Sequence, residues 1–183
     1  MKKIILMVSL ILSICIVSLE AQEAMFKKGE TVLNASIGLG SVLYSGLNLS
    51  SVVPPLGISL EYGIADKVID KGSVGVGGYV GYSAYKENPA FPPVYKYSNF
   101  IIGARGVLHY PFVARLDTYT GLMLGANIST ALGTKNPLGI PGGGPSFSWF
   151  AGARYYFNRD FAALAEIGYG IAWLNFGIAY KLN

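Results

Sequence analysis

The chain repeatedly alternates apolar residues with small or polar ones between Glu30 and Asn183, and no other feature restricts its fold as strongly. The clearest stretch runs from Leu56 to Ile64, where one face carries only leucine, isoleucine and tyrosine, and the other carries glycine, serine and a single glutamate. A period of two is typical of a β-strand. The second face is too small and too poor in charge to be a water-facing surface. The pattern therefore predicts a barrel whose apolar side is turned outward to lipid.

Hydrophobic residues make up 52% of the chain, yet no run of 18 apolar residues occurs after residue 20. A helix needs about 20 such residues to cross a bilayer, so helical spans are excluded. A spanning segment must satisfy its own backbone hydrogen bonds, which leaves a closed sheet as the remaining solution. The main architectural alternative is a soluble lipocalin-like barrel, which would carry many lysines and glutamates on one face. The four charges on the polar face of this chain argue against it.

The N-terminal residues 1–21 are predicted to be a cleaved secretory signal peptide. Two lysines precede an apolar run that ends near Leu19, and the small residue Ala21 follows. Cleavage there would leave residues 22–183 as a single barrel domain. The only cysteine, Cys15, lies inside the apolar run, where lipidation is the alternative to an ordinary signal-peptide residue. A mature chain without cysteine has neither disulfides nor thiol chemistry.

The alternation predicts eight strands, most of which have the roughly 9–11 residues that a tilted strand needs to cross a bilayer. The predicted strands are residues 31–40, 55–65, 73–85, 96–110, 117–128, 146–157, 161–170 and 173–182. Three connections, residues 41–54, 86–95 and 129–145, are long, and those at the other end are mostly short. Long outer loops and short periplasmic turns are the habit of outer-membrane barrels. The expected fold is an all-β, eight-stranded antiparallel up-and-down transmembrane β-barrel.

Charged residues test this arrangement, because a charge at the membrane midplane of the lipid face would cost about 2–4 kcal/mol. Most of them, Asp117 included, gather at predicted strand ends, and none falls on the predicted lipid face. Four fall on the inward face of their strands, and these are Glu61, Arg105, Arg154 and Glu166. Buried charges are expected to be paired. The two acids and two bases therefore predict a salt-bridge plug in a narrow lumen, with a gated ion or proton path through it as the alternative.

Three segments, Phe100–Gly106, Ala163–Gly170 and Asn175–Leu182, resemble the OmpA/OmpX class of small eight-stranded outer-membrane barrels. The last segment is similar to the C-terminal signal read by the barrel-assembly machinery. Its polar residue, glycine and two spaced hydrophobes are filled here by Asn175, Gly177, Tyr180 and Leu182. Family members typically end in an aromatic residue, whereas this chain ends in asparagine. The resemblance implies a Gram-negative outer membrane, lipid and lipopolysaccharide as surroundings, and the assembly machinery as a partner.

His109 is the only histidine and lies on the predicted inward side of the fourth strand. Without a partner motif, the sequence predicts a hydrogen-bonded residue at the barrel rim. Some eight-stranded barrels are lipid A acyltransferases or deacylases, and a deacylase would need histidine, serine and an acid converging on the outer wall. The sequence offers no such arrangement. No catalytic residue is therefore predicted, with a lipid A-modifying acyl enzyme kept as an alternative.

No cofactor or metal is predicted either, since the acids are dispersed over separate turns and the mature chain has one histidine and no cysteine. Without residues 1–21 the chain has 12 basic and nine acidic residues, and this net charge of +3 is spread over both ends of the barrel, which argues against nucleic acid as a partner. Specific roles on a rigid scaffold usually lie in its loops. The predicted function is structural: membrane integrity and surface contacts through residues 41–54, 86–95 and 129–145. A narrow ion-conducting pore is the alternative.

Overall fold

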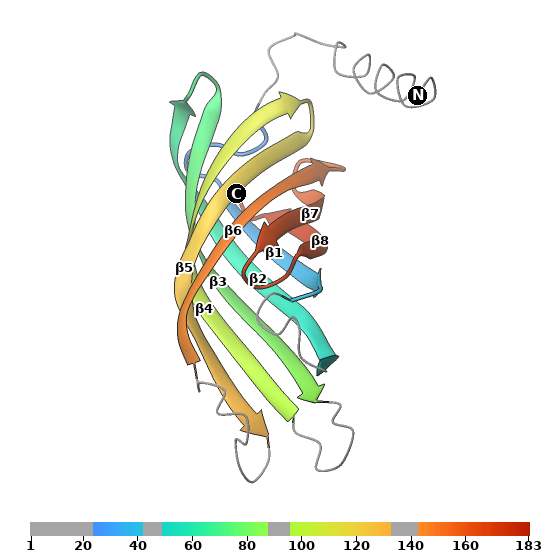
Figure 1. Ribbon diagram of the computed structural model, residues 1–183. Coiled ribbons are helices and arrows are strands. Elements are labelled where there is room, and N and C mark those ends of the chain that lie inside the picture. The colour runs from blue at the N-terminus through green and yellow to red at the C-terminus, as the bar shows by residue number, and fades with distance from the viewer. Residues whose placement is uncertain (1–23, 42–48, 88–95, 133–142) are drawn as a thin grey trace, which may run out of the picture.

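The computed structural model describes residues 24–41, 49–87, 96–132 and 143–183, whose strands close into one barrel (Figure 1). The strands are β1 (Thr31–Leu39), β2 (Leu49–Val68), β3 (Gly72–Glu87), β4 (Lys96–Val113), β5 (Leu116–Leu132), β6 (Gly143–Tyr156), β7 (Phe161–Tyr169) and β8 (Leu174–Lys181). Each strand pairs antiparallel with the next, and β1 pairs with β8 to close the ring. The predicted eight-stranded up-and-down barrel is confirmed. The predicted signal peptide lies outside the described residues.

Within the described ranges, no helix has the length and apolar character required to cross a membrane.

Alternation along each strand separates an outward from an inward face. In β2, the outward Leu56, Ile58 and Leu60 are 43–52% exposed, whereas the inward Ser59 and Glu61 are almost fully buried. Among the described residues, every exposed charged side chain lies in a turn or near a strand end. The outward surface between those ends is an apolar band, as expected of a wall that faces lipid.

Exposed aromatic side chains pair at both margins of this band. At the end with the short turns, the ring centroids of Phe161 and Tyr180 lie 4.6 Å apart. At the opposite end, Tyr169 and Trp173 pack edge to face at 5.9 Å. Aromatic girdles of this kind mark the two interfaces between membrane and water. The placement agrees with a barrel that spans a bilayer.

Short turns connect the strands at one end, which we call the turn end. The turns are residues 69–71, 114–115 and 157–160. Arg115 takes a left-handed backbone conformation (φ 64°), which allows the two-residue turn between β4 and β5. In the last turn, the Asn158 side-chain oxygen accepts hydrogen bonds from the backbone N–H groups of Asp160 and Phe161. The predicted short connections lie at these places.

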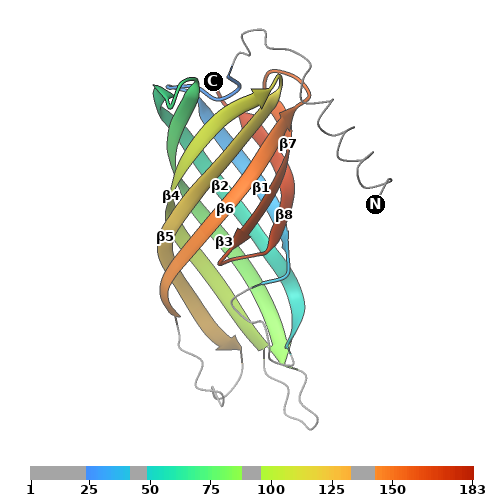
Figure 2. The same ribbon diagram turned by 45° about the horizontal axis from the view of Figure 1, so that its top comes forward.

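The strands differ in length, so the barrel is uneven at the opposite end, the loop end. Strands β2 to β5 have 16–20 residues, whereas β1, β7 and β8 have 8 or 9. The pairing of β1 with β2 stops at Leu56, and that of β7 with β6 stops at Trp149. Beyond these residues, β2 to β6 continue as an open curved sheet (Figure 2).

This extension changes the predicted boundaries. Residues 49–54 and 129–132, predicted as loop, belong to β2 and β5. Two prolines at 54 and 55 lie within β2, with register shifts against β3 between Ser51 and Leu56. Proline is tolerated there because the pairing of β2 with β1 stops at Leu56 and neither proline takes part in the register with β3, so no ladder hydrogen bond requires an N–H from them. Residues 42–48, 88–95 and 133–142 of the three predicted loops lie outside the described residues.

Candidate functional site

The four charged residues predicted for the lumen lie on the inward faces of four strands. Glu61 comes from β2, Arg105 from β4, Arg154 from β6 and Glu166 from β7, and none is more than 7% exposed. They form two ion pairs across the barrel. Arg105 Nη2 lies 2.6 Å from Glu166 Oε1, and Arg154 Nη2 lies 2.6 Å from Glu61 Oε2.

Two further residues, His109 and Asp117, belong to this cluster. Asp117 lies at the start of β5, as predicted for a strand-end charge, but its side chain belongs to the lumen set that the prediction limited to four residues and is only 3% exposed. Strand alternation turns it inward with Tyr119, where it accepts a hydrogen bond of 3.1 Å from Arg154 Nη1. His109 lies between two carboxylates, with Nδ1 2.8 Å from Asp117 Oδ1 and Nε2 2.5 Å from Glu61 Oε1.

These contacts define the charge state of the cluster. When both acids are ionised, as their contacts with Arg154 favour, each carboxylate only accepts hydrogen bonds, so the histidine between them donates from both ring nitrogens and carries a positive charge. Glu61, His109, Asp117 and Arg154 then form a closed ring of alternating charges. With the Arg105–Glu166 pair, three acids balance three bases. The buried cluster is therefore electroneutral.

Polar and aromatic neighbours hold the arginines in place. Arg105 Nη1 donates to Ser59 Oγ at 3.2 Å, and its guanidinium lies 3.8 Å from the centre of the Phe150 ring. The Arg154 guanidinium lies 4.6 Å from the centre of the Tyr119 ring, and the Tyr119 hydroxyl donates to Glu166 Oε1 at 3.0 Å. Cation–π contacts are worth more when desolvated, as here. The cluster is thus a connected network that spans the barrel interior.

Little open space remains beside this network. A small cavity of about 20 Å³ lies between the Arg105–Glu166 pair and the β7–β8 connection. Ser36, Tyr79 and Asn175 also line it. This volume suits about one water molecule. It is far too small for an acyl chain.

The cluster is not arranged as a hydrolase triad. Both ring nitrogens of His109 are occupied by carboxylates, so neither faces a serine hydroxyl. Ser73, its cross-strand neighbour, donates instead to the backbone carbonyl of Phe26 at 2.9 Å. Across the described residues, no group of three or more potential metal-ligating side chains is placed to hold a metal ion.

The residues of the predicted assembly signal lie in and just after β8. Asn175 and Gly177 are half-buried, whereas Tyr180 and Leu182 are exposed. A Cβ atom on Gly177 would lie 2.0 Å from the backbone oxygen of Ala35 in β1, so only glycine fits this closing seam without a shift. The structure thus gives Gly177 a packing role. Its recognition by the assembly machinery stays a prediction.

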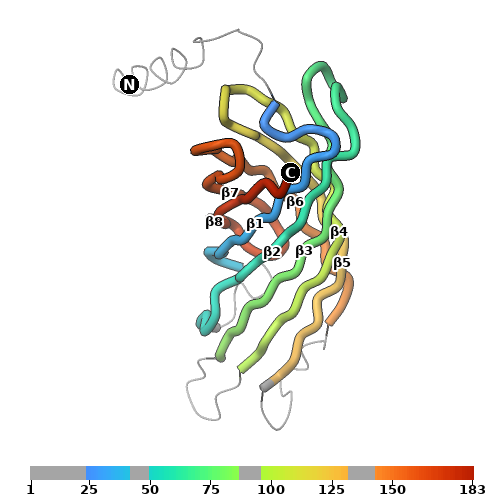
Figure 3. Tube along the Cα trace, turned by 180° about the vertical axis from the view of Figure 1, so that it is seen from behind, coloured from blue at the N-terminus to red at the C-terminus, as the bar shows by residue number. Residues whose placement is uncertain are grey.

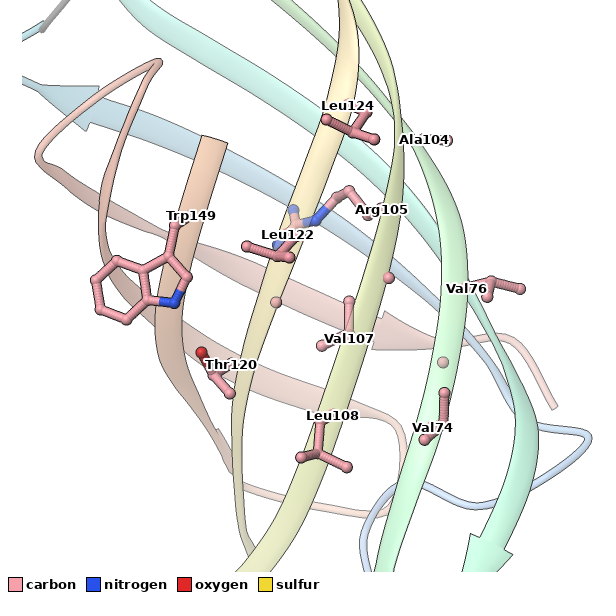
Figure 4. Close-up of a pocket in the computed structure, with 13 residues that line it drawn as sticks. Val74, Val76, Ala104, Arg105, Val107, Leu108, Thr120, Leu122, Leu124 and Trp149 are labelled. Carbon is pink, nitrogen blue, oxygen red and sulfur yellow. The ribbon is translucent and has the colours of Figure 1, made fainter. Parts of the chain in front are cut away.

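The outward face carries a shallow apolar groove of about 690 Å³ over β3 to β6 (Figure 4). It forms where Gly106 has no side chain between the larger Val76 and Leu122, and Trp149 flanks it. Arg105 points away from the groove toward the interior (Figure 4). The groove is part of the lipid-facing wall and is separate from the charged cluster.

Neither a protein-family model nor a curated protein sequence matches the chain. Among solved structures, the Yersinia pestis outer membrane protein Ail in a phospholipid bilayer nanodisc superimposes with a TM-score of 0.51 and 16% identity, over 85% of this chain and 100% of Ail. The N-terminal β-barrel domain of Pseudomonas aeruginosa OprF gives 0.48 and 14%, over 85% and 98%. Ail in complex with the heparin analogue sucrose octasulfate gives 0.45 and 11%, over 84% and 95%.

The fold and the outward apolar band together define the class of the protein. It has the architecture of the small, OmpA-like eight-stranded outer-membrane β-barrels, as the resemblance in sequence predicts. The outer membrane is the location that agrees with this architecture.

Proposed function

We propose that the chain is a structural and interaction barrel of the outer membrane, without catalytic activity, whose lumen is closed by its charged network. One observation carries the proposal: all six buried ionisable side chains of the cluster have an opposite charge at 2.5–3.1 Å. A neutral, connected network fills the interior of a barrel of eight strands, which is only just wide enough for side chains.

A structural role for His109 follows from the same contacts. A general base must reach the proton that it abstracts, and here both nitrogens are held by Glu61 and Asp117. This supports a non-catalytic protein over a lipid A-modifying enzyme. Mass spectrometry of lipid A from cells with and without the protein tests the point, and a changed acyl pattern would contradict it.

The proposal includes export and surface contacts. Residues 1–21 act as the signal peptide, and the segment Asn175–Leu182 is read by the barrel-assembly machinery. Residues 41–54, 86–95 and 129–145 make the surface contacts at the loop end, among lipopolysaccharide. Loss of the protein should increase the uptake of a hydrophobic dye by intact cells, since its role is to stabilise the outer membrane.

Conductance in a planar lipid bilayer tests the closed lumen directly. The purified barrel, folded as judged by faster gel migration before boiling, should produce no steady current steps. Asp160→Asn, in an exposed turn, is the matched control for handling and insertion, and it should be equally silent. Regular current steps from the unchanged chain would overturn the closed lumen and support the narrow pore.

A further inference from the structure

The segment that precedes β1, residues 24–30, crosses the turn end of the barrel beside the C-terminus (Figure 3). Phe26 inserts from this segment into the interior and is 1% exposed. Its ring stacks on the His109 ring, with 4.2 Å between centroids and 29° between planes. Its carbonyl accepts the hydrogen bond from Ser73 Oγ. Phe26 thus covers the face of the charged cluster that is nearest the turn end.

Contacts to β2 and β8 hold the segment in this position. On the β2 side, Gly29 N–H donates to the Gly63 carbonyl and Gly63 N–H donates to the Glu30 carbonyl, both at 2.9 Å. On the β8 side, Lys181 Nζ donates to the Met25 carbonyl at 2.6 Å and lies 3.0 Å from Glu30 Oε1. A further hydrogen bond of 2.7 Å joins Lys28 N–H to the Asp66 carboxylate.

The barrel wall is shaped to receive the segment. A Cβ atom on Gly63 would lie 2.1 Å from the Lys27 carbonyl oxygen, which is closer than any real contact. A Cβ atom on Gly75 would lie 3.1 Å from the Phe26 ring and 2.6 Å from the Glu61 carboxylate. By contrast, a Cβ atom on Gly78, further along β3, would meet nothing within 4 Å. Glycine at 63 therefore gives the segment its place against β2.

We propose that residues 24–30 are a built-in plug of the turn end, the end expected to face the periplasm, and that the plug seals the charged cluster from water and ions there. The inference rests on the proposed function: the charged network closes the lumen, and the plug is a second barrier at the turn end. The contacts that hold the plug lie outside the strand-to-strand ladder. The plug can therefore open as a local event, without breaking the barrel wall.

A single engineered cysteine tests the seal. In Ser73→Cys the thiol lies under Phe26, and a water-soluble maleimide should label it slowly in the folded barrel. Lys71→Cys, exposed in the neighbouring turn, gives the rate of an open site. Adding Gly63→Ala to S73C removes the place of the plug and should raise the labelling rate at least about ten-fold, because labelling then needs no local opening. Adding Gly78→Ala, the matched glycine control, should leave the rate unchanged.

The folded state of each variant is checked by gel migration before boiling, and mass spectrometry separates the label from any on Cys15. If the variant with Gly63→Ala does not fold, Phe26→Ala replaces it, with the same increase expected. Equal rates for S73C and K71C, or no increase when the plug is displaced, would overturn the plug. That result differs from failure of the proposed function, which is current through the unchanged chain.

Discussion

Asp117 accepts hydrogen bonds from both His109 and Arg154 and so completes the charged ring. Asp117→Asn leaves these two cations with Glu61 as their only anionic neighbour in the ring. Breaking a buried ion pair in this way costs about 3–5 kcal/mol. We expect a free energy of unfolding lower by that amount, measured by urea titration in detergent micelles with tryptophan fluorescence. Asp160→Asn, in an exposed turn, should change it by less than about 0.5 kcal/mol. Equal effects of the two variants would show that the ring does not stabilise the barrel.

For single residues, the face of the strand on which a side chain lies could be predicted from the sequence, whereas its ion-pair partner could not. Because side chains alternate along a strand, Glu61, Arg105 and Glu166 point into the barrel regardless of where each strand begins or ends. Which acid meets which base depends on the stagger of the strands around the barrel, which a sequence does not give. Asp117 was missed because its position beside a turn resembles that of a solvated charge. Asp117 is two residues from Tyr119 and therefore lies on the same, inward face of the strand, and this spacing could have identified its side chain as buried.

At the scale of the element, β8 closes the barrel against β1 through Gly177. Gly177→Ala should destabilise the closed form by about 1–3 kcal/mol, because the added methyl group overpacks the seam. The measurement is refolding of the purified chain from urea into micelles, with the fast-migrating band as the readout. Gly78→Ala should refold like the unchanged chain, since its methyl group has open space. Normal refolding of G177A, with poor assembly in cells only, would instead assign Gly177 to recognition by the assembly machinery.

The strands themselves could be predicted better than their ends. A run of alternating residues identifies β2, but two prolines near its start resemble a loop. They are accommodated because the pairing of β2 with β1 stops at Leu56 and the register with β3 shifts between Ser51 and Leu56, so no neighbouring strand needs a proline N–H. Strand ends thus depend on where the pairing with each neighbour stops, which is a property of the assembled barrel.

At the scale of the whole molecule, the outward band predicts how the barrel responds to a new charge. Leu122, in β5, is 50% exposed on this band. In a lipid bilayer, Leu122→Arg should lower the free energy of unfolding by about 2–4 kcal/mol. On a soluble barrel, the same substitution at an exposed position would change the free energy of unfolding by no more than about 0.5 kcal/mol. Urea unfolding in liposomes measures the difference, and Asp160→Arg in a turn is the control for added charge. A cost for Leu122→Arg no larger than that of the control would revive the soluble barrel.

The short strands β7, β8 and β1 lie together on one side of the barrel, with 8 or 9 residues each. A tilted strand needs about 9–11 residues to cross the hydrocarbon core, so this side fits a thin bilayer, while β3 and β4 have residues to spare. Such hydrophobic mismatch is relieved by tilting the molecule or by thinning the lipid beside it. The height of the wall that spans the membrane therefore differs around the circumference of the barrel. Acyl-chain length should then influence both its inclination and the lipids that gather along the β1–β8 seam.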